Sequence, residues 1–301
     1  MTTNINKEAI NAGCDYLLST QSSAGFWIDF DLPTGKSDAW VTAFVALSLS
    51  YANKIMHSTK ITASIHLAIK WLTCNRHYRA GWGYNEKTGP DADTTGYVVS
   101  LLTKYQYPIH SNDYQFLLSL QTDSGGFATY PKEDAWGLAH PDVTPIVFSA
   151  LNDENRTSIL SSTENYLRNN QVKPGFWPAY WWKNCHYSTY HNLKLAIELN
   201  IIEAPGELQI PQEHAFSVES AFDLAWLTAS ASLYSNGAYY DALSQELLTL
   251  QQPTGYWPGG DNLRVTDSNC EQPWVMPMGK YYADKQHSIT TASSIWTLSL
   301  N

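Results

Sequence analysis

The segment Gln21-Ser22-Ser23-Ala24-Gly25-Phe26-Trp27 contains a pattern of Gln, three residues, Gly, an aromatic residue and Trp. The same pattern runs from Gln171 to Trp177 and from Gln251 to Trp257, with a variant from Gln121 to Phe127 and a degenerate copy from Ala80 to Tyr84. Copies begin at residues 21, 121 and 171, so their spacing is a multiple of 50 residues. Recurrence at such a period is typical of a fold built from one repeated supersecondary unit.

Each copy joins two segments with helical periodicity. The segments before the turns are amphipathic and span residues 9–20, 61–74, 112–120, 158–169 and 239–250. The segments after the turns are more apolar and span residues 39–51, 95–104, 143–151, 189–199, 218–233 and 289–300. A sixth amphipathic segment, before residues 218–233, is interrupted by Ala204-Pro205-Gly206 and Pro211.

These two kinds of segment predict an all-α fold. An amphipathic helix buries one face, whereas a helix that is apolar all round is buried on every side. Because no strand pattern is present, we predict a single (α/α)6 barrel of paired helices over residues 1–301, with the apolar helices inside. The inner helices then run in one direction, and their N-termini meet at one mouth. The residues expected at this mouth are Asp38, Asp91, Asp93, Asp142, His186, Glu219, Gln286 and His287.

The stretch Pro90-Asp91-Ala92-Asp93-Thr94-Thr95 stands directly before the apolar run at residues 97–102. Asp and Thr are favourable N-cap residues, so both carboxylates are expected at the start of a helix. One reading is that a carboxylate only caps this helix. The other is that one carboxylic acid is kept protonated by its neighbour and donates a proton. The spacing leaves both readings open.

Composition excludes several classes of function. The net charge of −10 is unsuited to nucleic-acid binding, and no apolar run is long enough to span a membrane. The polar N-terminus is unlike a signal peptide and the four cysteines have no close spacing, so a reduced, cytoplasmic protein is expected. The 12 Trp and 19 Tyr exceed what the core needs, which favours an aromatic pocket for an apolar or cationic ligand.

The repeated turns resemble the QW repeats of the squalene-hopene cyclase superfamily, the class II terpene cyclases. The stretch from Asp91 to Thr95 resembles the Asp-x-Asp-Asp-Thr acid motif of that family, in its Asp-x-Asp-Thr-Thr variant. The stretches 39–42, 142–144 and 181–189 resemble further family motifs in the same order. The resemblance covers nearly the whole chain, but only the family's catalytic, β-type barrel. It implies an isomerase that cyclises a short linear isoprenoid, of sesqui- or diterpenoid size, through a carbocation.

The resemblance also implies roles for individual residues. Asp93 matches the family's proton donor, and Asp91 and Asp142 are its expected carboxylate neighbours. The hydroxyls of Thr94 and Thr95 are expected to fix the rotamer of the donor. Binding of the substrate and stabilisation of the carbocation are expected of the aromatic residues Trp40, Trp181, Tyr187, Trp136 and Tyr97.

The chain departs from the family in three ways. Thr94 replaces the third Asp of the acid motif, and the acid-supporting His of the family falls at Ile146. The candidates to replace that His are His140, His186 and His191. The 301 residues leave no room for the family's second barrel, which helps to enclose the substrate. Closure of the pocket is therefore expected from the long turn at residues 257–286 or from a second subunit in a homodimer.

Protonation of an alkene requires no cofactor, and the expected partner is a small isoprenoid. A substrate that keeps its diphosphate, however, requires Mg²⁺ or basic residues. The long turns at residues 128–142, 176–188 and 257–286 are expected at the mouth, and we call them the mouth turns. They carry the basic residues Lys183, Arg264, Lys280 and Lys285, and Arg76 and Arg79 lie near the second repeated turn. No Asp-Asp-x-x-Asp cluster is present, so ionisation of a diphosphate is not expected.

Other functions fit parts of the same pattern. A zinc-dependent enzyme like the β subunits of protein prenyltransferases would use Asp267, Cys270 and His287 as metal ligands, although their spacing differs. A barrel that binds a prenyl chain or another lipid without catalysis would explain the missing His. A carbohydrate-active (α/α)6 enzyme also combines aromatic residues with carboxylates. Retention of both Asp91 and Asp93 favours the cyclase.

Overall fold

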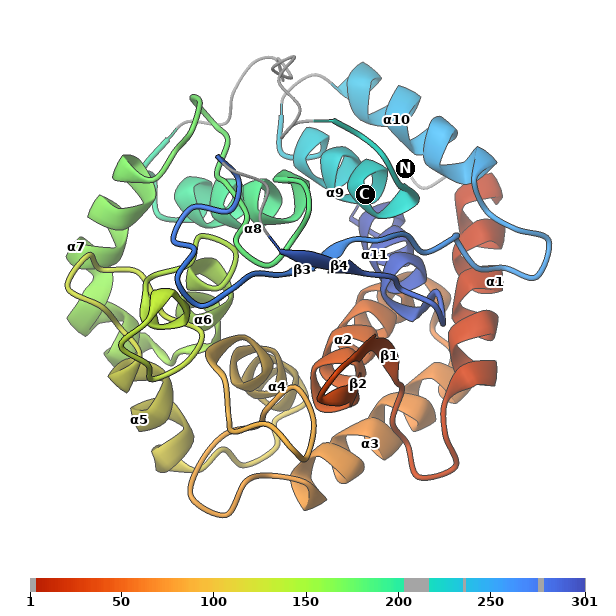
Figure 1. Ribbon diagram of the computed structural model, residues 1–301. Helices are drawn as coiled ribbons and strands as arrows, with labels where there is room; N and C mark the ends of the chain where they lie inside the picture. The colour runs from red at the N-terminus through yellow and green to blue at the C-terminus, as the bar shows by residue number, and fades with distance from the viewer. Residues whose placement is uncertain (1–3, 203–216, 235–236, 276–278, 301) are drawn as a thin grey trace.

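The computed structural model describes residues 4–202, 217–234, 237–275 and 279–300. Within these residues six helices form a closed inner ring, in which each helix packs on the next and the last packs on the first (Figure 1). The ring consists of α2 (Ala39–Met56), α4 (Ala92–Lys104), α6 (Thr144–Ala150), α8 (His186–Glu198), α9 (Ala221–Ala231) and α11 (Ser288–Leu298). The predicted all-α class is confirmed.

The remaining described helices lie outside this ring (Figure 1). They are α1 (Asn4–Thr20), α3 (Thr59–Cys74), α5 (Ser111–Ser119), α7 (Asp153–Asn169) and α10 (Gly237–Thr249). Their position follows from the sequence pattern, since α7 buries one face whereas every residue of α9 and α11 is buried. The interrupted segment with Ala204-Pro205-Gly206 and Pro211 lies outside the described residues. No described helix has both the length and the apolar character that crossing a bilayer requires.

The repeated turns tie each outer helix to the inner helix that follows. In four copies the indole N–H of Trp donates a hydrogen bond to the carbonyl oxygen ten residues earlier, from Trp27 to Leu17, Trp82 to Leu72, Trp177 to Leu167 and Trp257 to Leu247. The backbone N–H of the aromatic residue then donates to a Thr hydroxyl on the inner helix, at Thr42, Thr95, Thr144, Thr189 and Thr291. Because the same two hydrogen bonds are formed in successive repeats, the same residue types recur in the sequence of the turn.

The Gln of the turn connects neighbouring repeats. The side chain of Gln121 donates to the hydroxyl of Ser162 on α7, and that of Gln251 donates to the carbonyl of Ala9 on α1. The bond from Gln251 joins the last copy of the repeated turn to α1, the first helix of the chain. Gly255 has a φ of +94°, and a Cβ there would lie 2.3 Å from the carbonyl oxygen of Ala12, so this close approach requires glycine.

In the described part of the chain four short strands extend from the turns, and here the expectation that no strand is present was wrong. The strands β1 (Asp29–Leu32) and β2 (Gly35–Ser37) form one antiparallel ribbon, and β3 (Leu263–Val265) and β4 (Lys280–Tyr282) form another. Strands of three or four residues are too short to show alternation in the sequence. Figure 1 shows β3 and β4 across the centre of the ring, over its mouth.

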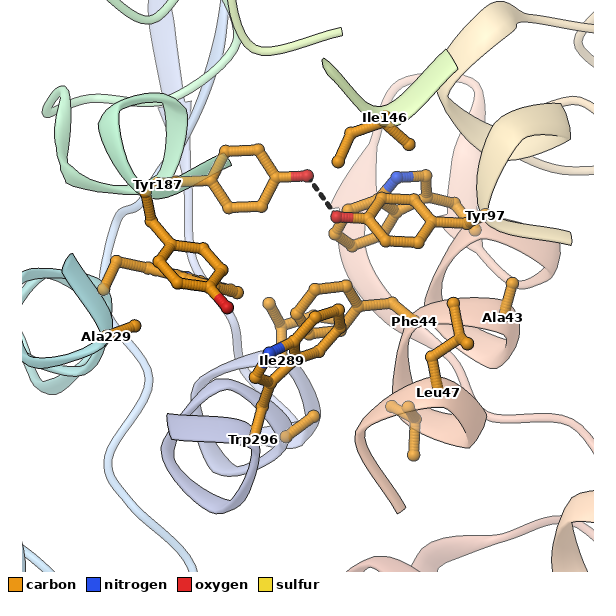
Figure 2. Packing of buried hydrophobic residues seen from close by; sticks show 14 of the residues in the cluster. Ala43, Phe44, Leu47, Tyr97, Ile146, Tyr187, Ala229, Ile289 and Trp296 are labelled. Atoms are coloured by element: carbon orange, nitrogen blue, oxygen red, sulfur yellow. Dashed lines mark hydrogen bonds between the residues drawn. The ribbon is translucent and has the colours of Figure 1, made fainter. Parts of the chain in front are cut away.

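Large side chains fill the interior of the ring below this mouth. Figure 2 shows Tyr97 of α4 and Tyr187 of α8 pointing toward one another, with their hydroxyl oxygens 2.5 Å apart. The rings of Phe44 and Trp296 stack beside them with centroids 5.9 Å apart. These four side chains are buried and belong to the core of the protein.

Candidate active site

A cavity of about 320 Å³ lies where the inner helices begin. Such a volume is within the usual range for small-molecule sites. The aromatic residues in its wall are Phe30, Trp40, Tyr84, Tyr130, Trp136, Trp181, Trp182 and Tyr282. Within the described part of the chain, the residues of charged type in its wall are two acids, Asp91 and Asp93. Both ribbons contribute aliphatic residues, which are Leu32, Leu263 and Val265. The cavity is therefore an apolar, aromatic space with two carboxyl groups in its wall.

Asp93 stands in the first turn of α4 and lines this cavity. Its Oδ2 accepts a hydrogen bond of 2.5 Å from the indole Nε1 of Trp40. Its Oδ1 is shielded from solvent and has no hydrogen-bond partner within the described residues. Since an indole N–H can only donate, Oδ2 must accept. A proton on this carboxyl group therefore resides on Oδ1.

The surroundings of Asp93 favour its neutral form. Burial raises the pKa of this carboxyl well above its ordinary value, and the nearby carboxyl groups of Asp91 and Asp142 raise it further. The hydrogen bond from Trp40 acts in the opposite direction, but it is the smallest of these effects. These surroundings therefore favour the carboxylic acid over the carboxylate at Asp93, beside an apolar cavity.

Asp91 has a different role, because it is the N-cap of α4. It accepts hydrogen bonds from the backbone N–H of Thr94 at 2.7 Å and from the hydroxyl of Thr94 at 2.9 Å. Burial raises its pKa to about 7. The capping interpretation is thus confirmed for Asp91, whereas Asp93 does not cap the helix. The expectation that Thr94 and Thr95 fix the rotamer of Asp93 was wrong, since Thr94 bonds to Asp91 and Thr95 belongs to the turn at Trp82.

Asp142 lies behind the cavity wall, before α6. Its Oδ2 accepts from the backbone N–H groups of Tyr180 at 2.9 Å and Trp181 at 2.7 Å. Burial raises its pKa to about 6. Asp142 is not among the residues that line the cavity, so its influence on Asp93 is electrostatic. It also positions Trp181, which does line the cavity.

The five aromatic residues expected at the site occupy two layers. Trp40, Trp136 and Trp181 line the cavity, whereas Tyr97 and Tyr187 are buried beneath it. The ring of Tyr97 meets that of Trp40 edge to face at 5.8 Å, so the lower layer supports the upper one.

Five of the aromatic residues in the cavity wall were not predicted as binding candidates, namely Phe30, Tyr84, Tyr130, Trp182 and Tyr282. Phe30 comes from β1, and no pattern in the sequence marks it. Trp182 could have been predicted as a binding residue, because it directly follows Trp181 in a mouth turn. The rings of Phe30 and Trp182 lie 6.5 and 5.7 Å from that of Trp40, so the three form one aromatic wall above Asp93.

None of the three candidate histidines hydrogen-bonds to Asp93. His140 bonds to the Thr129 hydroxyl at 2.6 Å and to the carbonyl of Ala135 at 3.0 Å. His186 bonds to the carbonyl of Ser217, and His191 lies against the rings of the lower layer, 4.6 Å from Tyr187. Trp40 is instead the hydrogen-bond partner of the acid.

The proposed zinc ligands do not come together. Among the described residues, no three side chains of His, Cys, Asp or Glu are placed to hold a metal ion. Nδ1 of His287 accepts from the backbone N–H of Gly259 at 3.0 Å, and its ring stacks on Tyr256. A neutral His287 ring then carries its proton on Nε2, so neither ring nitrogen has a free lone pair for a metal.

Two of the basic residues in the mouth turns, Arg264 and Lys183, interact with other parts of the protein rather than with the cavity. The buried guanidinium of Arg264 donates to the carbonyl oxygens of Tyr180, Ala179 and Pro273. Lys183 forms an ion pair of 2.5 Å with Glu219. Neither side chain lines the cavity.

Comparison with models of known families and with curated protein sequences gives no match. Among solved structures, the chain is similar to type II terpene cyclase MstE from Scytonema, in a variant bound to geranylgeranyl dihydroxybenzoate as substrate. The TM-score is 0.84 and the identity 24%, over 98% of this chain and 97% of that one. The chain therefore has the fold of this cyclase.

More distant structures share the fold less completely. The ent-copalyl diphosphate synthase from Streptomyces platensis matches 87% of this chain with 50% of its own length, at a TM-score of 0.57 and 14% identity. An α-1,6-mannanase from Salegentibacter matches 98% of this chain at a TM-score of 0.56 and 14% identity. Because one barrel architecture supports different chemistries, the function has to be argued from the site.

Proposed function

We propose that this protein is a class II terpene cyclase, an isomerase that starts cyclisation by protonating an alkene. The observation that carries the proposal is the carboxyl group of Asp93. It lines an aromatic cavity, one of its oxygens is held by Trp40, and the other has no partner within the described residues. The similarity to MstE supports the same class of reaction.

The energetic requirement explains why the carboxyl group is buried among other acids. An ordinary Asp has a pKa near 3.9, so at pH 7 only about one molecule in 10³ is protonated, a cost of roughly 4 kcal/mol. Burial and the neighbouring carboxyl groups of Asp91 and Asp142 lower this cost. Asp93 can then present a proton to an alkene at neutral pH.

The aromatic wall suits the intermediate that follows. Transfer of the Oδ1 proton to a terminal alkene leaves a carboxylate on Asp93 and a carbocation in the cavity. A second alkene of the chain attacks this cation, and a ring closes. The faces of Trp40, Trp181 and Trp182 stabilise positive charge through their quadrupoles without supplying a nucleophile.

The substrate proposed is a short linear isoprenoid with an uncharged head group. Among the described residues no Lys or Arg lines the cavity, so the negative charge of a diphosphate would have no basic partner there. Substrates with a diphosphate and Mg²⁺ remain the alternative. We further propose that residues 1–301 form a single (α/α)6 barrel, in which the two ribbons close the mouth without a second subunit.

The proposal is tested by incubating the protein with geranyl, farnesyl and geranylgeranyl alcohols, the corresponding diphosphates and prenylated phenols. Mass spectrometry should detect a cyclic product with the mass of its substrate, because the reaction is an isomerisation. In D₂O the product should carry one deuterium at the carbon that was protonated. Binding of these compounds without any conversion would instead support the lipid-binding alternative.

A further inference from the structure

Thr129 lines the cavity and bonds to two buried rings. Its hydroxyl lies 2.6 Å from Nδ1 of His140 and 2.8 Å from the indole Nε1 of Trp181. Its backbone carbonyl accepts from the N–H of Ala92, the residue before Asp93. The hydroxyl is thus placed close to the start of the helix that carries the acid.

The direction of these hydrogen bonds follows from the chemistry of the groups. The carbonyl oxygen of Ala135 can only accept, so Nε2 of His140, 3.0 Å away, must carry the proton. Burial lowers the pKa of His140 to about 3, so the ring is neutral and Nδ1 has a free lone pair. The hydroxyl of Thr129 therefore donates to Nδ1. Because the indole of Trp181 can only donate, the same hydroxyl oxygen accepts from it.

Thr129 consequently resembles a hydroxyl activated by an adjacent base. Its proton is already directed at an acceptor, and its oxygen keeps one lone pair that neither Trp181 nor His140 uses. His140 is held in place by stacking on Tyr180, with ring centroids 3.8 Å apart. Nothing in the protonation of the substrate by Asp93 employs this pair of side chains.

We propose that Thr129 and His140 form the base that ends the reaction, an inference that rests on the proposed cyclase function. The oxygen of Thr129 takes a proton from a carbon next to the cationic centre, and the electrons of that C–H bond form the new alkene. At the same time the hydroxyl proton of Thr129 moves to Nδ1 of His140. The product leaves as an isomer of the substrate, with Asp93 as a carboxylate and His140 as an imidazolium. Return of one proton to Asp93 restores the resting state.

The weak basicity of His140 suits this role. A ring with a pKa of about 3 does not take the proton of Asp93 before the substrate arrives. A carbocation is a far stronger acid than an imidazolium, so proton loss to the pair is still downhill.

The test compares Thr129→Val, which keeps the shape and removes the hydroxyl, with Thr129→Ser, which keeps the hydroxyl. In Thr129→Val the share of the principal wild-type alkene should fall at least about fivefold, in favour of isomeric alkenes or alcohols formed by water. The products are compared after equal consumption of substrate, so that the readout is the share of each product and not the rate. Thr129→Ser should restore the wild-type product. Identical product distributions in all three proteins would overturn the relay while leaving the cyclase proposal intact.

A second measurement needs no substrate. Nitrogen-15 NMR of labelled histidine should show His140 neutral at pH 7, with the proton on Nε2 and a hydrogen-bonded Nδ1 whose shift changes in Thr129→Val but not in Thr129→Ser. A proton on Nδ1 of His140 in the wild-type protein would overturn the relay whether or not a cyclase substrate is known.

Discussion

Two pairs of buried carboxyl groups lie near the mouth of the ring, and they differ in what surrounds them. In the first pair, Asp29 accepts from the backbone N–H groups of Gln286 and Ser288, and Asp284 accepts from those of Ile289 and Thr290. All four oxygens are thus bonded to the chain around the start of α11. In the second pair, Asp91 caps α4, but Asp93 has one oxygen without a partner and lines a cavity.

Burial raises the pKa of both Asp284 and Asp93 well above the ordinary value, and in each case a nearby carboxyl group adds to the effect. A raised pKa therefore does not by itself identify a catalytic acid. What separates the two pairs is an uncommitted oxygen beside a space that a substrate can occupy. On this basis we assign proton donation to Asp93 and a structural role to Asp29 and Asp284.

The largest expected effect is on the activity of Asp93→Asn. The amide keeps the size of the side chain and can still accept from Trp40, but it has no acidic proton. Turnover should fall by about 10⁴-fold, the upper end of what loss of a general acid causes. The midpoint of chemical denaturation should change little. Full turnover of Asp93→Asn, measured by mass spectrometry, would remove Asp93 from the mechanism.

The matched change in the other pair should affect stability instead. In Asp284→Asn an amide NH₂ replaces an oxygen that accepts a backbone N–H of α11, so one buried hydrogen bond is lost. The free energy of unfolding should decrease by about 2 kcal/mol in urea denaturation. Turnover per folded molecule should remain within a few-fold of wild type. A loss of turnover as large as that of Asp93→Asn would mean that the two pairs do not differ in function.

The carboxyl groups around the site should also make stability depend on pH. The pKa of Asp142 is about 6 in the folded protein and 3.8 ordinarily, so the folded state binds this proton more tightly. The resulting stabilisation is complete below about pH 4 and is lost as the pH rises to about 6. Replacing Asp142 by Asn should remove up to about 1.4 kcal/mol per pH unit from the slope of unfolding free energy in this window. An unchanged slope, measured by denaturation at each pH, would contradict the assignment.

The smallest expected effect is that of Trp40→Phe. The substitution keeps an aromatic ring and removes the N–H that bonds to Oδ2 of Asp93. Since that bond lowers the pKa of Asp93, its loss should raise the pKa, and the alkaline limb of the kcat/KM profile should move to higher pH. Turnover should fall about tenfold, because the donor is less well oriented. A limb that moves to lower pH would show that Trp40 does not act on the acid.

The helices could be predicted from the sequence because their turns carry an interaction that repeats. Each turn Trp must reach a carbonyl ten residues earlier, and each following helix must supply a Thr, so the residue types recur at fixed places. The ribbons could not be predicted, since strands of three residues leave no periodic signal. Yet they supply part of the cavity wall, including Phe30 and Leu263.

Only part of the site could be predicted from the sequence. The position of Asp93 at a helix start follows from local capping rules, as does the cap formed by Asp91. The division of roles between them depends on which oxygen is left without a partner, and that is set by Trp40, 53 residues away in the chain. The burial of Tyr97 and Tyr187 beneath the cavity depends likewise on how α4 and α8 face each other across the ring.

The protonation state of Asp93 can be measured directly by infrared spectroscopy. The difference spectrum between wild type and Asp93→Asn at pH 7 should contain the C=O stretch of a protonated carboxylic acid, and its position should indicate an apolar environment. The band should persist when the pH is raised above the value at which Asp91 titrates. A difference spectrum with only the bands of an ionised carboxylate would show that position 93 holds no proton to give, and the proposed start of the reaction would be excluded.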